Sequence, residues 1–263
     1  MNKRTFIIFL IFCVSLYFIF KFTQHKTYKQ IFFKHKENVS QKWANYLDIY
    51  EFYLPPYINQ NASILEIGVQ NGGHLQILSK YLKNAKIYGL DIDQNVCKLD
   101  LGKDIQTFCF NATEEELINK NMPNLNFDVI IDDGSHQSPD VIKTFQIMFY
   151  KLKPGGTYII EDMHASYWKE FQGGYQKPYT QIEYFKSLID ILNSYHINAN
   201  NSAETKNTEF YDSLSDIEKE FLRWTQSITF YDSVAVVKKL TKPRSGPYGS
   251  VFVGKIQPIK PLF

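Results

Sequence analysis

An alternation of strand-like and helix-like segments through the middle of the chain constrains its fold most strongly. Five short apolar or β-branched runs end in polar residues, at 63–69, 86–92, 105–111, 127–132 and 157–162. Helix-length segments such as 73–83 and 139–152 fill most of the gaps between them. Strands that alternate with helices favour a parallel sheet, because each crossover helix returns the chain to the same edge. The alternation therefore predicts an α/β fold with helices on both faces of the sheet.

The carboxyl-terminal third follows a different pattern. A helical segment, a polar stretch at 198–208 and a second helix precede two strand-like runs at 227–239 and 250–256. We expect these two runs to pair as an antiparallel hairpin that closes the sheet. The predicted fold class is α/β, with a Rossmann-like, doubly wound sheet of seven strands that is mostly parallel and has an antiparallel C-terminal strand.

The amino-terminal segment 6–20, "FIIFLIFCVSLYFIF", is apolar except for Ser15 and has basic residues on both sides. A helix rises about 1.5 Å per residue, so this run is short for a membrane core of about 30 Å, but flanking lysines can snorkel and extend it. A cleaved signal peptide would end in small residues, and none precede "KFTQHK". We expect an uncleaved, single-pass membrane anchor over 1–22, with the side of the membrane left open.

Beyond the anchor, the sequence predicts a basic juxtamembrane linker over 23–43 and one domain over 44–263. A helix is expected within 40–58, at the start of that domain, and Pro55 and Pro56 close it. The net charge of +2 is concentrated in the first 43 residues, and the rest is mildly acidic. This distribution excludes nucleic acid as a partner, because a nucleic-acid site needs basic residues on the folded domain.

The three cysteines, Cys13, Cys97 and Cys109, show no CxxC pair and no repeated spacing. Their arrangement predicts neither a disulfide framework nor a zinc site. It leaves the redox compartment open.

The first predicted strand and turn carry the signature of a nucleoside site. Glu66 and Gly68 end the strand, and Gly72 opens the next helix. Glycines there let the backbone approach a ligand closely, whereas their alternative role is only to form a tight turn. Asp91 ends the second strand, where a carboxylate can accept both hydroxyl groups of a ribose. The order of these residues predicts a nucleoside-like ligand.

This turn resembles the E/D-x-G-x-G-x-G turn of class I S-adenosylmethionine (SAM)-dependent methyltransferases, from which it departs at Gln70. The resemblance implies SAM as the cofactor. It assigns Asp91 to the ribose, and Asn111, after the third strand, to the adenine amino group.

Acidic residues follow the fourth and fifth predicted strands, which should be neighbours about 4.8 Å apart. They are Asp132, Asp133, Glu161 and Asp162. Like charges at one sheet edge raise each other's pKa unless a cation lies among them, and hard oxygen ligands favour Mg²⁺ or a similar ion. The alternative is that the first two acids cap the following helix and the others are solvated loop residues.

His136, three residues beyond Asp133, is the natural base for such a site. An imidazole has an ordinary pKa of about 6.5, which suits proton transfer from a hydroxyl at neutral pH. We expect Gly134 to form the turn between them. Ser138 and Pro139 should then begin the next helix.

Two stretches, "FDVIIDDGSH" (127–136) and "LKPGGTYIIEDMHASYW" (152–168), resemble the metal-dependent sugar O-methyltransferases of macrolide biosynthesis, of the macrocin and mycinamicin type, and their cephalosporin-hydroxylase-like relatives. The resemblance implies Asp133, Glu161 and Asp162 as Mg²⁺ ligands and His136 as the base. Asp132 is assigned to the cofactor side. Larger members of that family carry an additional amino-terminal domain, so acceptor specificity and contacts with a second copy stay open.

The segment that follows the predicted metal ligands is rich in aromatic residues. Tyr167, Trp168 and Tyr175 suit either the faces of sugar rings or simple packing over a loop, whereas His164 and His196 are expected to be structural.

The sequence thus predicts a SAM-dependent and Mg²⁺-dependent O-methyltransferase that acts on a hydroxyl of a small-molecule or glycan acceptor, first of all a sugar. One alternative is a catechol-type or phenol-type small-molecule O-methyltransferase. Another is a non-catalytic SAM-binding scaffold protein.

Overall fold

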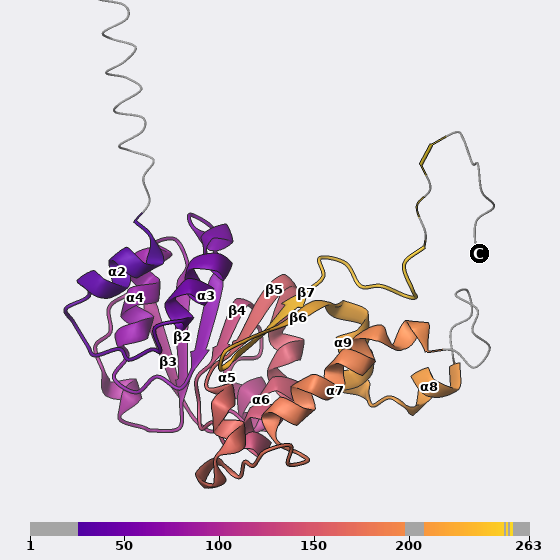
Figure 1. Ribbon diagram of the computed structural model, residues 1–263. Helices are drawn as coiled ribbons and strands as arrows, with labels where there is room; N and C mark the ends of the chain where they lie inside the picture. Colours follow the sequence, from indigo (N-terminus) through magenta and orange to yellow (C-terminus); the bar gives the residue numbers. More distant parts are fainter. Residues whose placement is uncertain (1–25, 198–207, 250, 252, 255–263) are drawn as a thin grey trace, which may run out of the picture. The chain divides into compact units, whose positions relative to one another are not determined.

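The structure is a computed structural model that describes residues 26–197, 208–249, 251, 253 and 254. The chain divides into two compact units, with the boundary between Phe110 and Asn111 (Figure 1). The predicted anchor over 1–22 lies outside the described residues. Within the described part of the chain, no helix combines the length and the apolar character that a membrane crossing requires.

Three parallel strands form the sheet of the first unit, in the order β3-β2-β1. They are β1 (Ser63–Ile67), β2 (Lys86–Asp91) and β3 (Ile105–Cys109). The predicted strands are present, and each ends one or two residues earlier than expected. β1 ends at Ile67 because Gly68 has a φ of 86° and leaves the extended conformation.

The helices of the first unit, in sequence order, are α2 (Tyr28–Lys34), α3 (Tyr46–Tyr53), η1 (Pro55–Tyr57), α4 (Gly73–Tyr81) and η2 (Val96–Lys98). Helix α3 ends before Pro55, as expected. Helix α2 lies inside the predicted linker, which is a difference from the prediction over 23–43. The physical reason is Tyr28, which is fully buried and packs its ring against Tyr50 and Tyr81. The aromatic residues among the lysines therefore make this segment part of the fold.

A disulfide joins Cys97 in η2 to Cys109 at the end of β3. The sequence predicted no disulfide, and this prediction was wrong for this pair. The two cysteines are 12 residues apart, a spacing that matches no common motif. They meet because η2 packs beside β3.

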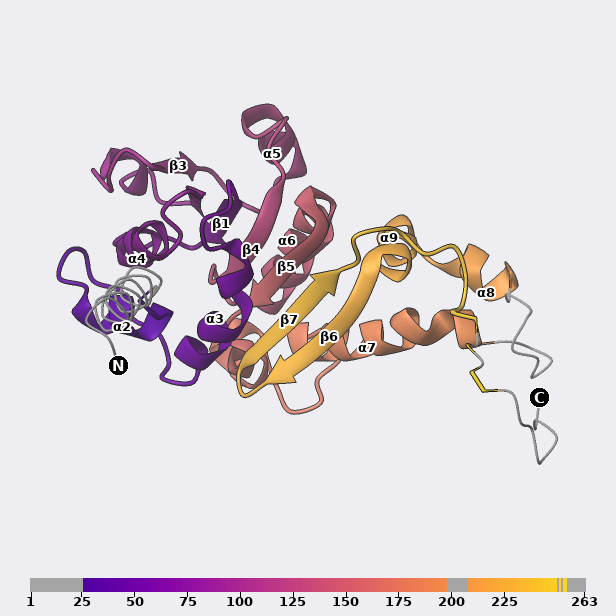
Figure 2. The ribbon, with the colours of Figure 1, turned by 90° about the horizontal axis from the view of Figure 1, so that it is seen from above.

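The second unit contains four strands in the order β4-β5-β7-β6 (Figure 2). Strands β4 and β5 are parallel, whereas β7 is antiparallel to both of its neighbours, β5 and β6. The strands are β4 (Phe127–Asp132), β5 (Leu152–Ile160), β6 (Thr225–Tyr231) and β7 (Val234–Lys239).

The C-terminal hairpin differs from the prediction in its position. The single run expected at 227–239 is divided by Asp232 and Ser233, and Ser233 has a φ of 65°, which turns the chain. The hairpin therefore lies within this run. The described residues of the other predicted strand, Val251, Val253 and Gly254, belong to no strand.

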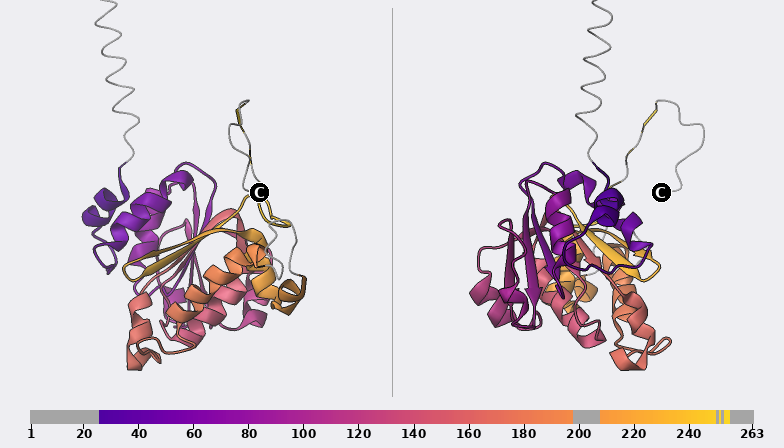
Figure 3. Two further views of the ribbon diagram at one scale, coloured as in Figure 1. Left: turned by 45° about the vertical axis from the view of Figure 1, so that its right-hand side comes forward. Right: turned by 90° about the vertical axis from the view of Figure 1, so that its left-hand side faces the viewer.

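The helices of the second unit are α5 (Glu115–Asn121), α6 (Ser138–Lys151), η3 (Met163–Tyr167), η4 (Lys169–Phe171), α7 (Gln181–Asn193), η5 (Ser194–His196), α8 (Thr208–Ser213) and α9 (Asp216–Trp224). Helices α6, α7 and α9 pack against one another beneath the strands (Figure 3). The rings of Phe145, Phe149, Phe185 and Phe221 fill this layer. This core fixes the strand ends from which the candidate site is built.

Candidate active site

The ends of β4 and β5 bring the predicted acids to one sheet edge. Asp132 and Ile160 are register partners, so the chain leaves both strands at the same level. Asp133, His136 and Asp162 then gather so that one ligand atom from each lies within 4.8 Å of the others. His136 Nε2 is 3.7 Å from Asp133 Oδ1 and 3.4 Å from Asp162 Oδ2. We call these three residues the acid–imidazole cluster.

Two members of the acid–imidazole cluster have an unusual backbone conformation. His136 has a φ of 55° and Asp162 a φ of 53°, both in the left-handed region that side chains rarely adopt. Such residues are found most often at functional sites, where surrounding structure holds them in place. The chain bends at Gly134, as expected, and His136 adds a left-handed residue before α6. Helix α6 begins at Ser138, as predicted.

The donor set of the cluster fits a hard divalent cation. The two carboxylates supply the hard oxygen ligands that Mg²⁺ and related ions prefer, whereas an imidazole is more typical of transition-metal sites. The side chains of Asp133, His136 and Asp162 are 24%, 20% and 22% exposed, so an ion can enter from solvent. Asp133 and Asp162 stand where the sequence predicted ligands. His136, which the sequence predicted only as a base, lies in the same group of clustered ligand atoms.

Glu161 and Asp132 are placed differently from their neighbours. Glu161 is buried, its N–H donates to the Asp132 carbonyl at 2.9 Å, and it is not in the group of clustered ligand atoms. Its role as a metal ligand stays a prediction. Asp132 is buried and accepts hydrogen bonds from Tyr158 Oη at 3.2 Å and the Gly134 N–H at 3.4 Å. Burial raises the pKa of Asp132 to about 7. Asp132 and Asp133, although adjacent in sequence, therefore have different environments, because Asp132 is buried and Asp133 is partly exposed.

The glycine turn of the first unit has a left-handed backbone at three alternate positions. They are Gly68, Gln70 and Gly72, with φ values of 86°, 48° and 77°. Gln70 thus occupies a conformation that favours glycine, which explains why the class I pattern has glycine there. A Cβ at Gly72 would lie 2.5 Å from Leu101 Cδ2. The turn is therefore tightly constrained.

Asp91 fixes this turn from the end of β2. Its Oδ2 accepts the N–H of Val69 at 2.7 Å and of Gln70 at 3.2 Å, and its Oδ1 accepts the N–H of Asp93 at 2.9 Å. A carboxylate oxygen has more than one lone pair, so these bonds leave acceptor capacity for a ribose. The predicted roles of Asp91, Gly68 and Gly72 in cofactor binding are consistent with this geometry and stay predictions.

Glu66 lies in a buried network that sequence reasoning missed. Its Oε1 accepts from Lys42 Nζ at 3.2 Å and faces His74 Nδ1 at 2.5 Å, and His74 Nε2 is 2.6 Å from Tyr28 Oη. The Lys42 and Glu66 side chains are each 2% exposed. No spacing in the sequence marks Lys42 or His74 as partners of Glu66, and Lys42 belongs to the predicted linker.

The charges around Glu66 decide its ionisation. Burial alone would raise the pKa of Glu66, but the positive charges of His74 and Lys42 outweigh it and hold the pKa below its usual value. Its second oxygen, Oε2, is buried without a hydrogen-bond partner among the described residues. A buried carboxylate oxygen without a donor is the kind of acceptor that a bound ligand can satisfy.

Asn111 begins the second unit, so the predicted cofactor residues divide between the units. Its side-chain oxygen accepts from both the N–H and the Oγ1 of Thr113 at 3.0 Å. This is a local turn of the kind that Asn often forms. Its expected contact with adenine stays a prediction, as does the assignment of Asp132 to the cofactor.

Two curated relatives are O-methyltransferases by name. The mycinamicin VI 2''-O-methyltransferase of Micromonospora griseorubida is 34% identical over 155 residues, which are 54% of this chain and 38% of the relative. The 8-demethyl-8-alpha-L-rhamnosyl tetracenomycin-C 2'-O-methyltransferase of Streptomyces olivaceus is 30% identical over 164 residues, which are 58% of this chain and 43% of the relative. The chain thus spans less than half the length of either relative.

A solved structure of the MycE methyltransferase from the mycinamycin biosynthetic pathway, in complex with Mg and SAH, matches this fold with a TM-score of 0.67. The two are 26% identical, and the match covers 83% of this chain and 55% of that chain. The likeness confirms a Rossmann-like fold with a seven-stranded mixed sheet. The sequence pattern of the family described as "methyltransferase domain" matches residues 58–220, more than half of the chain. The chain therefore belongs to the methyltransferase domain family.

Proposed function

We propose that this protein is a SAM-dependent O-methyltransferase that needs Mg²⁺ or a similar divalent cation and acts on a hydroxyl of a sugar or glycoconjugate. The acid–imidazole cluster carries this proposal, because it places a base beside two candidate metal ligands at the carboxyl ends of parallel strands. The relative whose name specifies a rhamnosyl group supports the choice of a sugar hydroxyl.

The proposed reaction is a single in-line displacement. The acceptor oxygen bonds to the methyl carbon of SAM, the carbon–sulfur bond breaks with its electron pair moving to sulfur, and the hydroxyl proton moves to His136 Nε2. A bound divalent cation supplies stabilisation for negative charge on the acceptor oxygen. Asp133 and Asp162 would hold that cation, and their oxygens, 3.7 and 3.4 Å from His136 Nε2, keep the imidazole beside it.

The cofactor side of the proposal uses residues of the first unit. Gly68 and Gly72 allow close approach of the backbone to SAM, and Asp91 supplies acceptors for the ribose hydroxyls. The Glu66 Oε2 atom supplies a buried, negatively charged acceptor for a donor group of the cofactor. The fit of SAM is thus supported by an atom whose hydrogen-bonding capacity is unused among the described residues.

A binding measurement tests the proposal first. Titration calorimetry of the protein with SAM, with and without Mg²⁺, should show SAM binding, and radiolabelled methyl transfer to a panel of glycosides should then require the metal. His136→Ala should lose about 10²–10⁴-fold in rate. The control is His196→Ala, at an exposed histidine outside the cluster. Absence of SAM binding would contradict the proposal, and activity that survives His136→Ala would favour an acidic phenol as the acceptor.

We propose, in addition, that residues 1–22 anchor the protein in a membrane. The apolar run 6–20 and its basic flanks support this, and the side of the membrane is left open. Carbonate extraction of membranes should leave the full chain in the pellet and release a variant that lacks residues 2–22. Release of the full chain would contradict the anchor.

A further inference from the structure

Residues 92–101, which we call the 92–101 segment, follow Asp91 directly in the first unit. The segment begins at this candidate ribose acid, because Asp91 Oδ1 accepts the Asp93 N–H at 2.9 Å. It ends against the glycine turn, where the Leu101 side chain packs so closely on Gly72 that an added Cβ would lie 2.5 Å from Leu101 Cδ2. Both ends of the segment therefore contact residues that the proposed function assigns to cofactor binding.

Little of the 92–101 segment is buried between these two ends. Val96 and Leu101 are 3% and 7% exposed, and the other residues of the segment are exposed. Asp93 Oδ1 accepts both the N–H and the side-chain amide of Asn95, at 2.9 and 3.0 Å, but these bonds lie within the segment and do not attach it to the sheet. A segment with so little buried apolar surface depends on its other attachments to stay in place.

The disulfide attaches the middle of the 92–101 segment to the sheet. Cys97 is bonded to Cys109, the last residue of β3, and the Cys109 carbonyl accepts from Gln94 Nε2 at 2.8 Å. The covalent bond joins residues 12 apart in sequence and removes the conformations in which η2 leaves β3. When the disulfide is reduced, the Gln94 hydrogen bond and the packing of Val96 remain as attachments of this part among the described residues.

Cys97 is an exposed residue, so thiols in solution can reach the disulfide. The thiolate of a low-molecular-weight thiol such as glutathione attacks Cys97 Sγ, the sulfur–sulfur bond breaks, and Cys109 leaves as a thiolate that takes a proton. A second thiol then releases Cys97 from the mixed disulfide. In total, two thiols become one disulfide and the protein gains two electrons and two protons. Glutathione disulfide reverses the reaction.

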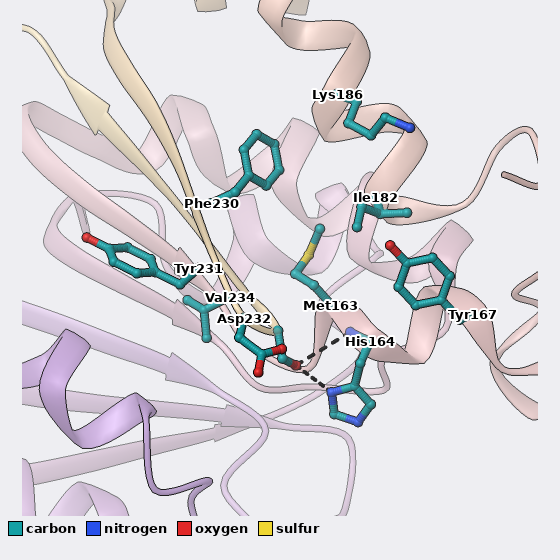
Figure 4. Close-up of a pocket in the computed structure, with 10 residues that line it drawn as sticks. Met163, His164, Tyr167, Ile182, Lys186, Phe230, Tyr231, Asp232 and Val234 are labelled. Carbon is teal, nitrogen blue, oxygen red and sulfur yellow. Dashed lines mark hydrogen bonds between the residues drawn. The ribbon is translucent and has the colours of Figure 1, made fainter. Parts of the chain in front are cut away.

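The second unit attaches the residues that follow its strand-end acid by hydrogen bonds. The Met163 N–H, next after Asp162, donates to the Ser233 carbonyl at 2.9 Å, and His164 Nδ1 is hydrogen-bonded to Ser233 Oγ (Figure 4). The three cysteines of the chain are at positions 13, 97 and 109, so residues 111–263 contain none. A reductant therefore acts on the first unit and leaves these hydrogen bonds of the second unit in place.

We propose that Cys97 and Cys109 are positioning residues for the cofactor, and that their disulfide sets the affinity for SAM by fixing the 92–101 segment. The oxidised protein holds Asp91 and the glycine turn ready for the ribose. Reduction frees the segment, and binding then has to order it at a cost in conformational entropy. The inference rests on the SAM-dependent function proposed above. It assigns the form that binds SAM tightly to an oxidising compartment, in which disulfides persist.

The experiment measures SAH affinity by titration calorimetry for the full chain in its oxidised and reduced forms. Every protein tested carries Cys13→Ser, so that Cys97 and Cys109 are the cysteines that remain. We expect reduction with dithiothreitol to weaken SAH binding at least about tenfold, because the freed segment must be ordered on binding, and reoxidation with glutathione disulfide to restore it. The double variant Cys97→Ser, Cys109→Ser should bind as weakly as the reduced protein and should not respond to dithiothreitol. If this variant does not fold, reduction of the native cysteines tests the same bond without a substitution.

A variant in the second unit separates positioning from stability, because loss of a disulfide also lowers stability. Lys239 is buried and its Nζ donates to the Phe149 and Leu152 carbonyls at 2.7 and 3.0 Å. Lys239→Met should lower the urea midpoint of unfolding and leave SAH affinity unchanged.

Amide hydrogen exchange gives a local measurement that does not depend on the cofactor. Without SAH, exchange in the 92–101 segment should be faster in the reduced protein than in the oxidised protein. Exchange in α6 of the second unit should be the same in both forms.

Equal SAH affinity in the oxidised and reduced forms would overturn the inference, and so would unchanged hydrogen exchange in the 92–101 segment. A loss of affinity in Lys239→Met as large as the loss on reduction would assign the effect to stability and overturn it as well. Failure of the proposed function gives a different result, because a protein that does not use SAM binds SAH in neither redox state. That result would overturn both proposals together.

Discussion

The two units each carry acidic side chains at or just beyond the carboxyl end of a parallel strand. They are Glu66 in the first unit and Asp133 and Asp162 in the second, and their surroundings differ. Glu66 is buried with Lys42 and His74, two cationic or potentially cationic partners from its own chain. Asp133 and Asp162 are partly open to solvent and share one imidazole. Removing a charge from water is costly unless an opposite charge accompanies it.

The comparison shows two ways to keep acids ionised at a ligand-binding edge. In the first unit the protein supplies the positive charge, so Glu66 remains a permanent acceptor. In the second unit Asp133 and Asp162 are accessible to solvent, so a cation from solution can supply the positive charge. Four predictions test this contrast, beginning with the largest expected effect.

Removing one carboxylate of the acid–imidazole cluster should strongly reduce activity without affecting the first unit. Asp133→Asn should reduce methyl transfer by about 10²-fold or more, because it removes a predicted metal ligand and a partner of His136. SAM affinity measured by calorimetry should stay close to that of the wild type. The control Asp190→Asn changes an exposed aspartate on α7, outside the cluster. A similar loss in both variants would contradict the assignment.

Breaking the Glu66 network should instead reduce stability. Lys42→Met leaves a buried carboxylate with one cationic partner fewer, a change that costs about 3–5 kcal/mol in buried ion pairs. Urea denaturation followed by circular dichroism measures the free energy of unfolding. Lys36→Met, at an exposed position of the same segment, is the matched control. Equal stability of the two variants would show that Lys42 does not compensate Glu66.

Mg²⁺ should stabilise the protein through the second unit only. A ligand that binds the folded state at a hundredfold excess over its Kd adds about 2.7 kcal/mol. Thermal unfolding should therefore shift upward with Mg²⁺ in the wild type and in Glu66→Gln, but not in Asp162→Asn. A Mg²⁺ response that persists in Asp162→Asn would place the ion elsewhere.

The smallest expected effect is a pH dependence that arises from Glu66. Its folded-state pKa lies below the ordinary value, because the charges of His74 and Lys42 outweigh burial. The unfolded state then binds the proton more readily, so the stabilisation is present above about pH 4.3 and is lost as the pH falls through the folded-state pKa. The difference in urea midpoint between the wild type and Glu66→Gln should shrink in acid. Glu116→Gln, at an exposed position, controls for net charge.

The order of strands and helices was predictable because it depends on local patterns. The runs at 63–69 and 127–132 became β1 and β4 with their polar residues at the strand ends, and parallel pairing then brought Asp133 and Asp162 together. Short, nearly continuous apolar runs that end in polar residues, together with the rule for parallel crossovers, are enough to reach this result.

Long-range pairings were not predictable in this way. The burial of Tyr28 and Lys42 and the disulfide between Cys97 and Cys109 depend on contacts between residues that no local sequence pattern connects. Composition made Lys42 look like part of a solvated linker, and only its tertiary partner, Glu66, explains its burial.

The packing of Tyr28 and Lys42 has a practical consequence for recombinant work. A truncation at residue 44, where the sequence predicts the domain to begin, would delete both residues and leave Glu66 and His74 without two of their partners. It would also uncover Gly73, which packs against the Asn38 and Val39 carbonyls so closely that an added Cβ would lie 2.3–2.4 Å from their oxygens. A shortened protein intended for crystallisation should therefore begin before Thr27, the residue that caps α2.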